Sequence, residues 1–94
     1  IACVIRARDY EHALEILNDT DFGLTAGIIT QSLATASDFK KRAVSGCVMV
    51  NLPTAGTDYH VPFGGRKASS FGPREQGQYA REFYTTVKTS YLQA

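Results

Sequence analysis

The segment around which this sequence is organised reads VPFGGRKASSFGPRE, from Val61 to Glu75. Because glycine has no Cβ, Gly64, Gly65 and Gly72 indicate backbone that takes a positive φ or lies directly against another segment. A flexible linker would need neither these glycines nor two phenylalanines. We therefore predict an ordered loop that packs on the rest of the protein.

This loop is expected to lead into a helix from Pro73 to Phe83. A helix tolerates proline best at its first position, and the helix dipole favours an acid such as Glu75 in the first turn. Residues Leu52 to Gly72, which include most of this segment, show neither helical nor alternating periodicity. Loops of this length in a compact domain are usually functional.

Upstream of the loop, apolar runs alternate with amphipathic stretches. Strands are predicted over residues 1–5, 22–30 and 47–51. Asp9 and Ser32 are candidate N-caps for the two intervening helices, and Gly46 is expected to close the second helix. The order strand, helix, strand, helix, strand predicts an α/β fold with a parallel βαβαβ layer.

The C-terminal residues show the clearest alternating pattern. From Thr85 to Leu92, Val87, Thr89 and Tyr91 fall on one face and polar residues on the other. A last strand leaves an open edge, which other strands tend to cover. We therefore predict a homo-oligomer that pairs through Thr85–Leu92.

The 94 residues allow one domain at most, and a formal net charge of +1 gives no reason to expect nucleic acid or a membrane as partner. No apolar run approaches the roughly 18 residues of a membrane span. Cys3 and Cys47 lie in apolar runs, so we expect buried thiols in a reducing, cytoplasmic protein with no metal site. The chain starts at Ile1, inside a predicted strand, and is expected to be a fragment of a longer protein.

Several separated motifs resemble those of the NAD(P)-dependent aldehyde dehydrogenases. The most specific is PFGGRKAS from Pro62 to Ser69, and YTTVKT follows from Tyr84 to Thr89. NDTDFGLTAG (residues 18–27) and GCVMVN (residues 46–51) precede them in the order and spacing of that family. The resemblance implies that residues 1–84 are the C-terminal portion of the catalytic domain and that residues 85–94 are an oligomerisation strand.

The family resemblance implies oxidation of an aldehyde to a carboxylic acid with NAD or NADP, through a thiohemiacetal, hydride transfer and thioester hydrolysis. It also implies that the family's nucleophile, general base and cofactor-binding residues lie upstream of Ile1. No catalytic, cofactor-binding or metal-binding residue is therefore assigned here, and the chain alone should be inactive. Cys47 has no neighbouring histidine or helix N-terminus to activate its thiol.

By the same resemblance, four residues are candidates for the substrate pocket. Phe63 would lie near the substrate tunnel, and Thr57, Asp58 and His60 would help to line its mouth. Two alternatives remain open: Phe63 is a core residue, and His60 is a loop residue that only forms hydrogen bonds.

Two segments are most similar to the branch of the family that acts on α-ketoglutaric semialdehyde (2,5-dioxopentanoate). These are NLPTAGTDYH from Asn51 to His60 and SSFGPRE from Ser69 to Glu75. The branch implies an acidic semialdehyde as substrate. Arg66 or Arg74 could pair with its carboxylate, although structural salt bridges are the alternative for both.

Two other classes of function remain possible. The first is a non-catalytic α/β module that self-associates through Thr85–Leu92. The second is a small phosphate-binding domain built on Gly64-Gly65-Arg66-Lys67, although this segment lacks the glycine spacing of a P-loop.

Overall fold

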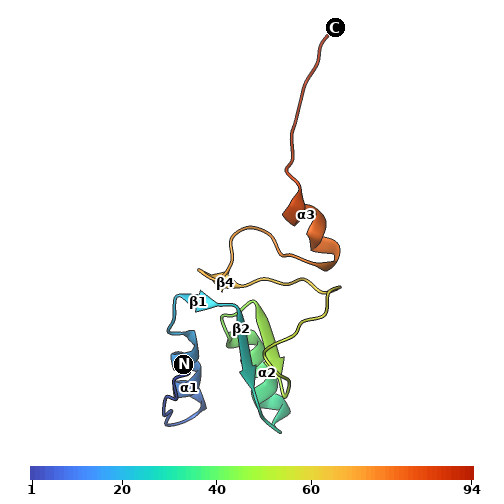
Figure 1. The fold of residues 1–94 in the computed structure, drawn as a ribbon. Helices are drawn as coiled ribbons and strands as arrows, with labels where there is room; N and C mark the ends of the chain where they lie inside the picture. The colour runs from blue at the N-terminus through green and yellow to red at the C-terminus, as the bar shows by residue number, and fades with distance from the viewer.

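The structure is a computed structural model that describes residues 1–94. At its centre lies one parallel strand–helix–strand unit (Figure 1). Strand β2 (Thr25–Ile28) leads through helix α2 (Leu33–Arg42) to strand β3 (Cys47–Val50). The two strands pair in parallel, with Thr25 opposite Cys47 and Ile28 opposite Val50. Two of the predicted strands thus pair in parallel as expected, but Phe22 and Gly23, at the start of the predicted strand 22–30, belong to another sheet.

Helix α1 (Tyr10–Asn18) packs against this unit and completes the core. Its N-cap is Asp9, whose carboxylate accepts a 2.9 Å hydrogen bond from the His12 amide, as the sequence predicts. Ser32 likewise caps α2 by accepting a 3.2 Å hydrogen bond from the Thr35 amide. The buried hydrophobic side chains are Leu14, Ala26, Phe39 and Ala43.

A polar cluster joins α1 to α2 at the surface. The Arg42 guanidinium binds both carboxylate oxygens of Glu11, at 2.6 and 2.9 Å, and lies 3.1 Å from Asp38. The Tyr10 hydroxyl donates a 2.8 Å hydrogen bond to Asp38. The hydrogen bond from Arg42 lowers the pKa of Glu11, and the one from Tyr10 lowers the pKa of Asp38. Burial, followed by the hydrogen bond to Asp38, raises the pKa of Tyr10.

The glycine-rich loop, Val61–Glu75, folds back onto the segment that follows α1. Its strand β4 (Arg66–Lys67) pairs antiparallel with strand β1 (Phe22–Gly23). The Lys67 ammonium donates hydrogen bonds to the carbonyls of Asn18 and Thr20, at 2.6 and 2.8 Å. Since these carbonyls lie at and just after the end of α1, Lys67 stabilises the negative end of that helix.

Gly46 does not close helix α2, contrary to the prediction. The helix ends at Arg42, and its C-cap is Ala43. Gly46 instead lies against the glycine-rich loop, where an added Cβ would come within 1.8 Å of the Gly64 carbonyl oxygen. Glycine is therefore required at this position because two backbone segments approach each other closely.

The strand predicted over residues 1–5 is not formed. This segment has no paired neighbour within the chain, and Ile1, Val4 and Ile5 are exposed. Cys3 is exposed with them, contrary to the expected burial, while Cys47 is half-buried on β3. An apolar run becomes a strand only where another strand accepts its hydrogen bonds, so the βαβαβ layer is present here only as its second βαβ half.

The helix predicted from Pro73 to Phe83 begins later than expected. A 3-10 turn covers Gly77–Tyr79, and helix α3 covers only Ala80–Tyr84. The backbone of Glu75 is already engaged with that of Phe63, in two hydrogen bonds of 2.7 and 2.8 Å. Because this bridge requires extended backbone, the helix cannot start at Pro73.

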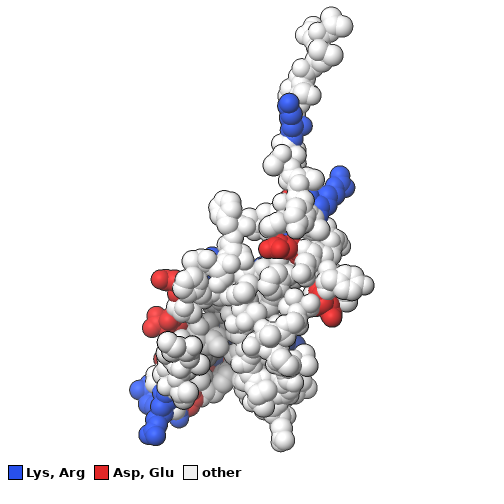
Figure 2. All heavy atoms as spheres, viewed as in Figure 1, with Lys and Arg blue, Asp and Glu red and all other residues white.

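Residues 85–94 project from α3 as an extended arm, and the predicted strand is not formed within this chain (Figure 1). Val87, Tyr91 and Leu92 are each at least 95% exposed. Figure 2 shows that the arm carries few charged atoms. The radius of gyration is 17.8 Å, against roughly 12 Å for a compact domain of this length. None of the helices is both long and apolar enough to cross a membrane.

Candidate functional site

The parallel strands β2 and β3 end at the same edge of the sheet, where α/β proteins usually bind their ligands. Asn51 directly follows β3, and its amide N–H donates a 2.8 Å hydrogen bond to the Ile28 carbonyl. The Asn51 side chain also binds the backbone of Thr30 twice: it accepts from the N–H and donates to the carbonyl, each at 2.8 Å. The loop Leu52–Val61 starts from this point.

This loop surrounds a hollow of about 380 Å³. Its lining residues are Met49, Leu52, Pro53, Ala55, Gly56, Thr57, Asp58 and Val61. The loop also folds back on the sheet, since the Thr54 methyl group lies where a Cβ on Gly27 would be only 2.8 Å away. The hollow is largely apolar, with one hydroxyl and one carboxylate, and its size suits a small organic molecule.

The structure brings together two of the four residues that the sequence suggests for a substrate pocket. Thr57 and Asp58 both line the hollow, whereas His60 and Phe63 do not. His60 is exposed, and its ring meets that of Tyr59 edge to face, with 5.3 Å between the ring centroids. Phe63 is half-buried. Contact of these four residues with a substrate stays a prediction.

The far end of the loop is fastened to the segment before α3. Phe63 and Glu75 form the backbone bridge described above. In addition, the Gly77 amide donates a 3.3 Å hydrogen bond to the Tyr59 carbonyl. A Cβ on Gly77 would lie 2.4 Å from the His60 carbonyl oxygen, and the backbone there takes a φ of +55°. Only glycine fits this position without displacing the loop.

The polar groups of the glycine-rich motif are used to hold its own backbone. The Gly65 amide donates to the Ser70 hydroxyl at 2.6 Å, and the Gly23 amide donates to the Ser69 hydroxyl at 2.9 Å. The Arg74 guanidinium donates to the Gly65 carbonyl at 2.7 Å.

These contacts argue against a phosphate cradle. A cradle needs free backbone amides and a free cation, but the Gly65 amide, Lys67 and Arg74 are all bound to other groups of the chain. Arg66 is the one cation of the motif that these contacts leave free, so the segment offers a phosphate little of what a cradle needs. Arg66 and Arg74 form no salt bridge in the structure, so the structural salt bridges considered for them are absent.

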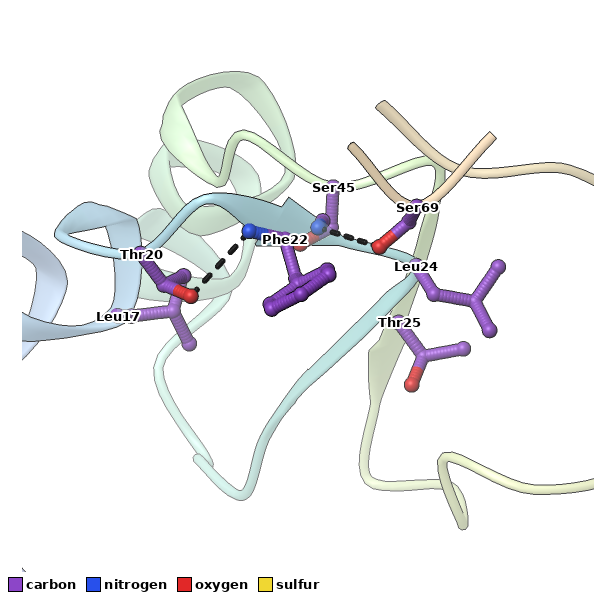
Figure 3. Close-up of a pocket in the computed structure, with 8 residues that line it drawn as sticks. Leu17, Thr20, Phe22, Leu24, Thr25, Ser45 and Ser69 are labelled. Carbon is purple, nitrogen blue, oxygen red and sulfur yellow. Dashed lines mark hydrogen bonds between the residues drawn. The ribbon is translucent and has the colours of Figure 1, made fainter. Parts of the chain in front are cut away.

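A second hollow, of about 320 Å³, lies between the end of α1 and the start of β2 (Figure 3). Its lining residues are Leu17, Thr20, Phe22, Gly23, Leu24, Thr25, Ser45 and Ser69. The Thr20 hydroxyl accepts a hydrogen bond from the Phe22 amide, and that of Ser69 accepts the one from Gly23. With two of its four hydroxyls engaged and no titratable side chain in its lining, this hollow is better suited to packing than to chemistry.

The chain brings together no nucleophile and base. The Cys47 thiol lies 3.9 Å from the Gly64 carbonyl and forms no hydrogen bond with a histidine or a carboxylate. No group of three His, Cys, Asp or Glu side chains is placed to hold a metal ion. The titratable groups with shifted pKa values belong to the α1–α2 cluster, which joins two helices and does not line the hollow at the Leu52–Val61 loop.

Two features of this region were not predicted from the sequence. One is the binding of Asn51 to Thr30, and the other is the binding of Lys67 to the end of α1. The first left a weak signal, because asparagine directly after a strand tolerates a positive φ. The second left none, because Asn18 and Lys67 are 49 residues apart.

The chain matches a known family over nearly its whole length. Residues 1–90 match the aldehyde dehydrogenase family, and the chain is therefore a member of that family.

Among its relatives, the alpha-ketoglutaric semialdehyde dehydrogenase of Bacillus subtilis is 38% identical over 92 residues. The alpha-ketoglutarate semialdehyde dehydrogenase of Haloferax volcanii is 42% identical over 92 residues. These alignments cover 98% and 97% of this chain but 19% of each relative. The chain thus spans about a fifth of their length.

A solved structure agrees with this assignment. It is that of a putative methylmalonate-semialdehyde dehydrogenase from Sinorhizobium meliloti, complexed with NAD. It superposes on this chain with a TM-score of 0.81 at 36% sequence identity, over 89% of this chain and 17% of the solved one. The arrangement of elements described above is therefore one that aldehyde dehydrogenases share.

Proposed function

We propose that this chain is the C-terminal part of the catalytic domain of an NAD(P)-dependent aldehyde dehydrogenase that oxidises an acidic semialdehyde to a dicarboxylic acid. α-Ketoglutaric semialdehyde is the proposed substrate. The observation that carries this proposal is the similarity to two α-ketoglutaric semialdehyde dehydrogenases over nearly the whole chain. The segments Asn51–His60 and Ser69–Glu75 suggest the same branch, and the first of them supplies most of the lining of the candidate site.

Within that enzyme, the proposed task of the chain is to form one wall of the substrate pocket. The hollow at the loop Leu52–Val61 supports this role, because it lies at the carboxyl edge of the parallel strands. The loop itself is held at both ends by hydrogen bonds. The nucleophile, the base and the dinucleotide site are supplied by residues outside this chain. NAD or NADP, once bound there, would accept the hydride.

The charge of the hollow bears on how an acidic substrate would lie. Asp58 is the only charged residue of its lining, and a carboxylate repels another carboxylate in its neighbourhood. We infer that the acidic end of the substrate lies away from this wall. Thr57 and the apolar residues would then face the aldehyde end or the carbon chain.

The proposal is tested with the whole protein that carries this chain. Reduction of NAD or NADP is followed by absorbance with α-ketoglutaric semialdehyde, with a neutral aldehyde and with an aminoaldehyde of similar length. We expect kcat/KM to be at least about tenfold higher for the acidic semialdehyde, equivalent to about 1.4 kcal/mol. Preference for the neutral or the amino compound would overturn the substrate, and no oxidation of any aldehyde would overturn the activity.

We also propose that the protein is a cytoplasmic homo-oligomer that associates through Thr85–Leu92. The exposed apolar side chains of the arm support this association. A non-catalytic self-associating module would show the association without the activity, so the assay above separates the two possibilities.

A further inference from the structure

Asn51 stands at the point where the loop leaves the sheet, and its backbone is in an unusual conformation. Its φ is +56°, in the left-handed region, which non-glycine residues seldom occupy. The reversed φ turns the chain sharply after β3, between Met49 and Leu52, both of which line the hollow. Residues held in this region often serve a function.

The Asn51 side chain continues the hydrogen-bond pattern of the β2–β3 pair beyond the end of the strands. Its amide both accepts from and donates to the backbone of Thr30, at 2.8 Å in each case, as a paired peptide group would. The Thr30 hydroxyl in turn accepts a 3.1 Å hydrogen bond from the Ser32 amide, and Ser32 is the N-cap of α2. Asn51 thus ties the start of the loop to a fixed helix end.

The loop has little internal structure of its own. Between Leu52 and Val61 the only backbone hydrogen bond is the one from the Val61 amide to the Asp58 carbonyl, at 3.3 Å. At its far end the loop is held by the Gly77–Tyr59 hydrogen bond and the Phe63–Glu75 bridge. The position of Thr57 and Asp58 therefore depends on the two ends of the loop, and Asn51 holds the first.

We propose that Asn51 is a positioning residue of the dehydrogenase, which keeps the loop Leu52–Val61 at the distance from the sheet that aldehyde binding requires. This inference rests on the proposed function. Asn51 does not line the hollow, so its effect on the aldehyde would pass through the loop. The binding of the dinucleotide, assigned to residues outside this chain, should not depend on it.

The test is Asn51→Asp in the whole protein. The carboxylate keeps an acceptor for the Thr30 amide but places an oxygen against the Thr30 carbonyl, where the structure needs a donor. We expect the KM for the aldehyde to rise about tenfold and the KM for the dinucleotide to stay within about twofold. Protonation of the introduced carboxylate would restore the donor, so the difference from wild type should shrink as the pH is lowered.

Asn18 offers a matched control. Its side chain also binds backbone twice, accepting from the Val44 amide at 2.9 Å and donating to the Arg42 carbonyl at 3.0 Å. It does so between α1 and the end of α2, and it does not line the hollow. Asn18→Asp is the same chemical change, so it should lower the melting temperature but leave both KM values within about twofold of wild type.

Asn51→Gly keeps the test decisive if Asn51→Asp does not fold. Glycine accepts the positive φ without strain but cannot bind Thr30, so it too should raise the aldehyde KM alone. Unchanged aldehyde kinetics in a folded Asn51 variant of an active enzyme, or an equal effect of Asn18→Asp, would overturn this inference. A wild-type protein that oxidises no aldehyde would instead overturn the proposed function.

Discussion

The central layer and the C-terminal arm both carry periodic sequence patterns, but only the layer forms paired strands. In the layer, β2 pairs with β3, and Leu14 and Phe39 are buried between its helices and the sheet. In the arm, Thr85–Tyr91 alternates, yet the arm pairs with no strand of this chain and its apolar side chains are exposed. The difference shows that a periodic pattern fixes the local geometry, whereas a strand also needs a partner for its backbone hydrogen bonds.

The largest effect is expected in the layer, from Phe39→Ala. Phe39 is 4% exposed and contributes the largest side chain of the core. Truncation of a buried phenylalanine leaves a cavity and costs about 3 kcal/mol or more. Urea unfolding of the whole protein should show this loss as a lower transition midpoint.

Lys40→Ala is the control for Phe39, because it lies one residue further on the same helix and is exposed. Its effect should be within about 0.5 kcal/mol. A loss from Phe39→Ala as small as that from Lys40→Ala would mean that the layer does not depend on this core.

A smaller effect is expected in the arm, from Val87→Asp. If Val87 packs against a second subunit, a charge there must be desolvated when the subunits associate. The dissociation constant of the assembly should therefore rise about tenfold or more. Light scattering after size-exclusion chromatography measures the assembly. Thr86→Asp places the same charge on the opposite face of the strand and should have less effect. Equal association of all three proteins would contradict pairing through this face.

The smallest effect concerns the polar cluster between α1 and α2. The pKa values of Glu11 and Asp38 are lowered in the folded state, so the cluster contributes stability above their ordinary values of about 4 and loses it as the pH falls below them. The pKa of Tyr10 is raised, so its contribution is present below about pH 10 and is lost at higher pH.

Arg42→Leu tests this pH dependence, because it removes the cation that binds Glu11 and Asp38. The melting temperature of the variant should fall less steeply than that of wild type between about pH 5 and pH 2, where these carboxylates become protonated. Parallel curves would show that the exposed cluster adds nothing, as is common for surface ion pairs.

Much of the layer could be predicted from the sequence, because its signals are local. Asp9 and Ser32 cap the helices as expected, and Cys47–Val50 forms the expected strand. The start of α3 could not be predicted, since Glu75 is committed to Phe63 by contacts that local pattern does not show.

The candidate site was predicted only in part. The resemblance suggested Thr57 and Asp58, and both line the same hollow. The position of that hollow depends on contacts between residues far apart in the sequence, such as Asn51 with Thr30 and Gly77 with Tyr59. Such contacts leave little trace in composition or periodicity.

The central claim is that the loop Leu52–Val61 forms a wall of the aldehyde pocket, and Thr57→Phe tests it most directly. Kinetics of the whole protein should show the KM for α-ketoglutaric semialdehyde raised about tenfold, because the ring fills the hollow, with the KM for the dinucleotide within about twofold. Thr57→Val, in which the new side chain has about the size of threonine, should behave more like wild type. Unchanged aldehyde kinetics in a folded Thr57→Phe protein would show that this loop does not face the substrate.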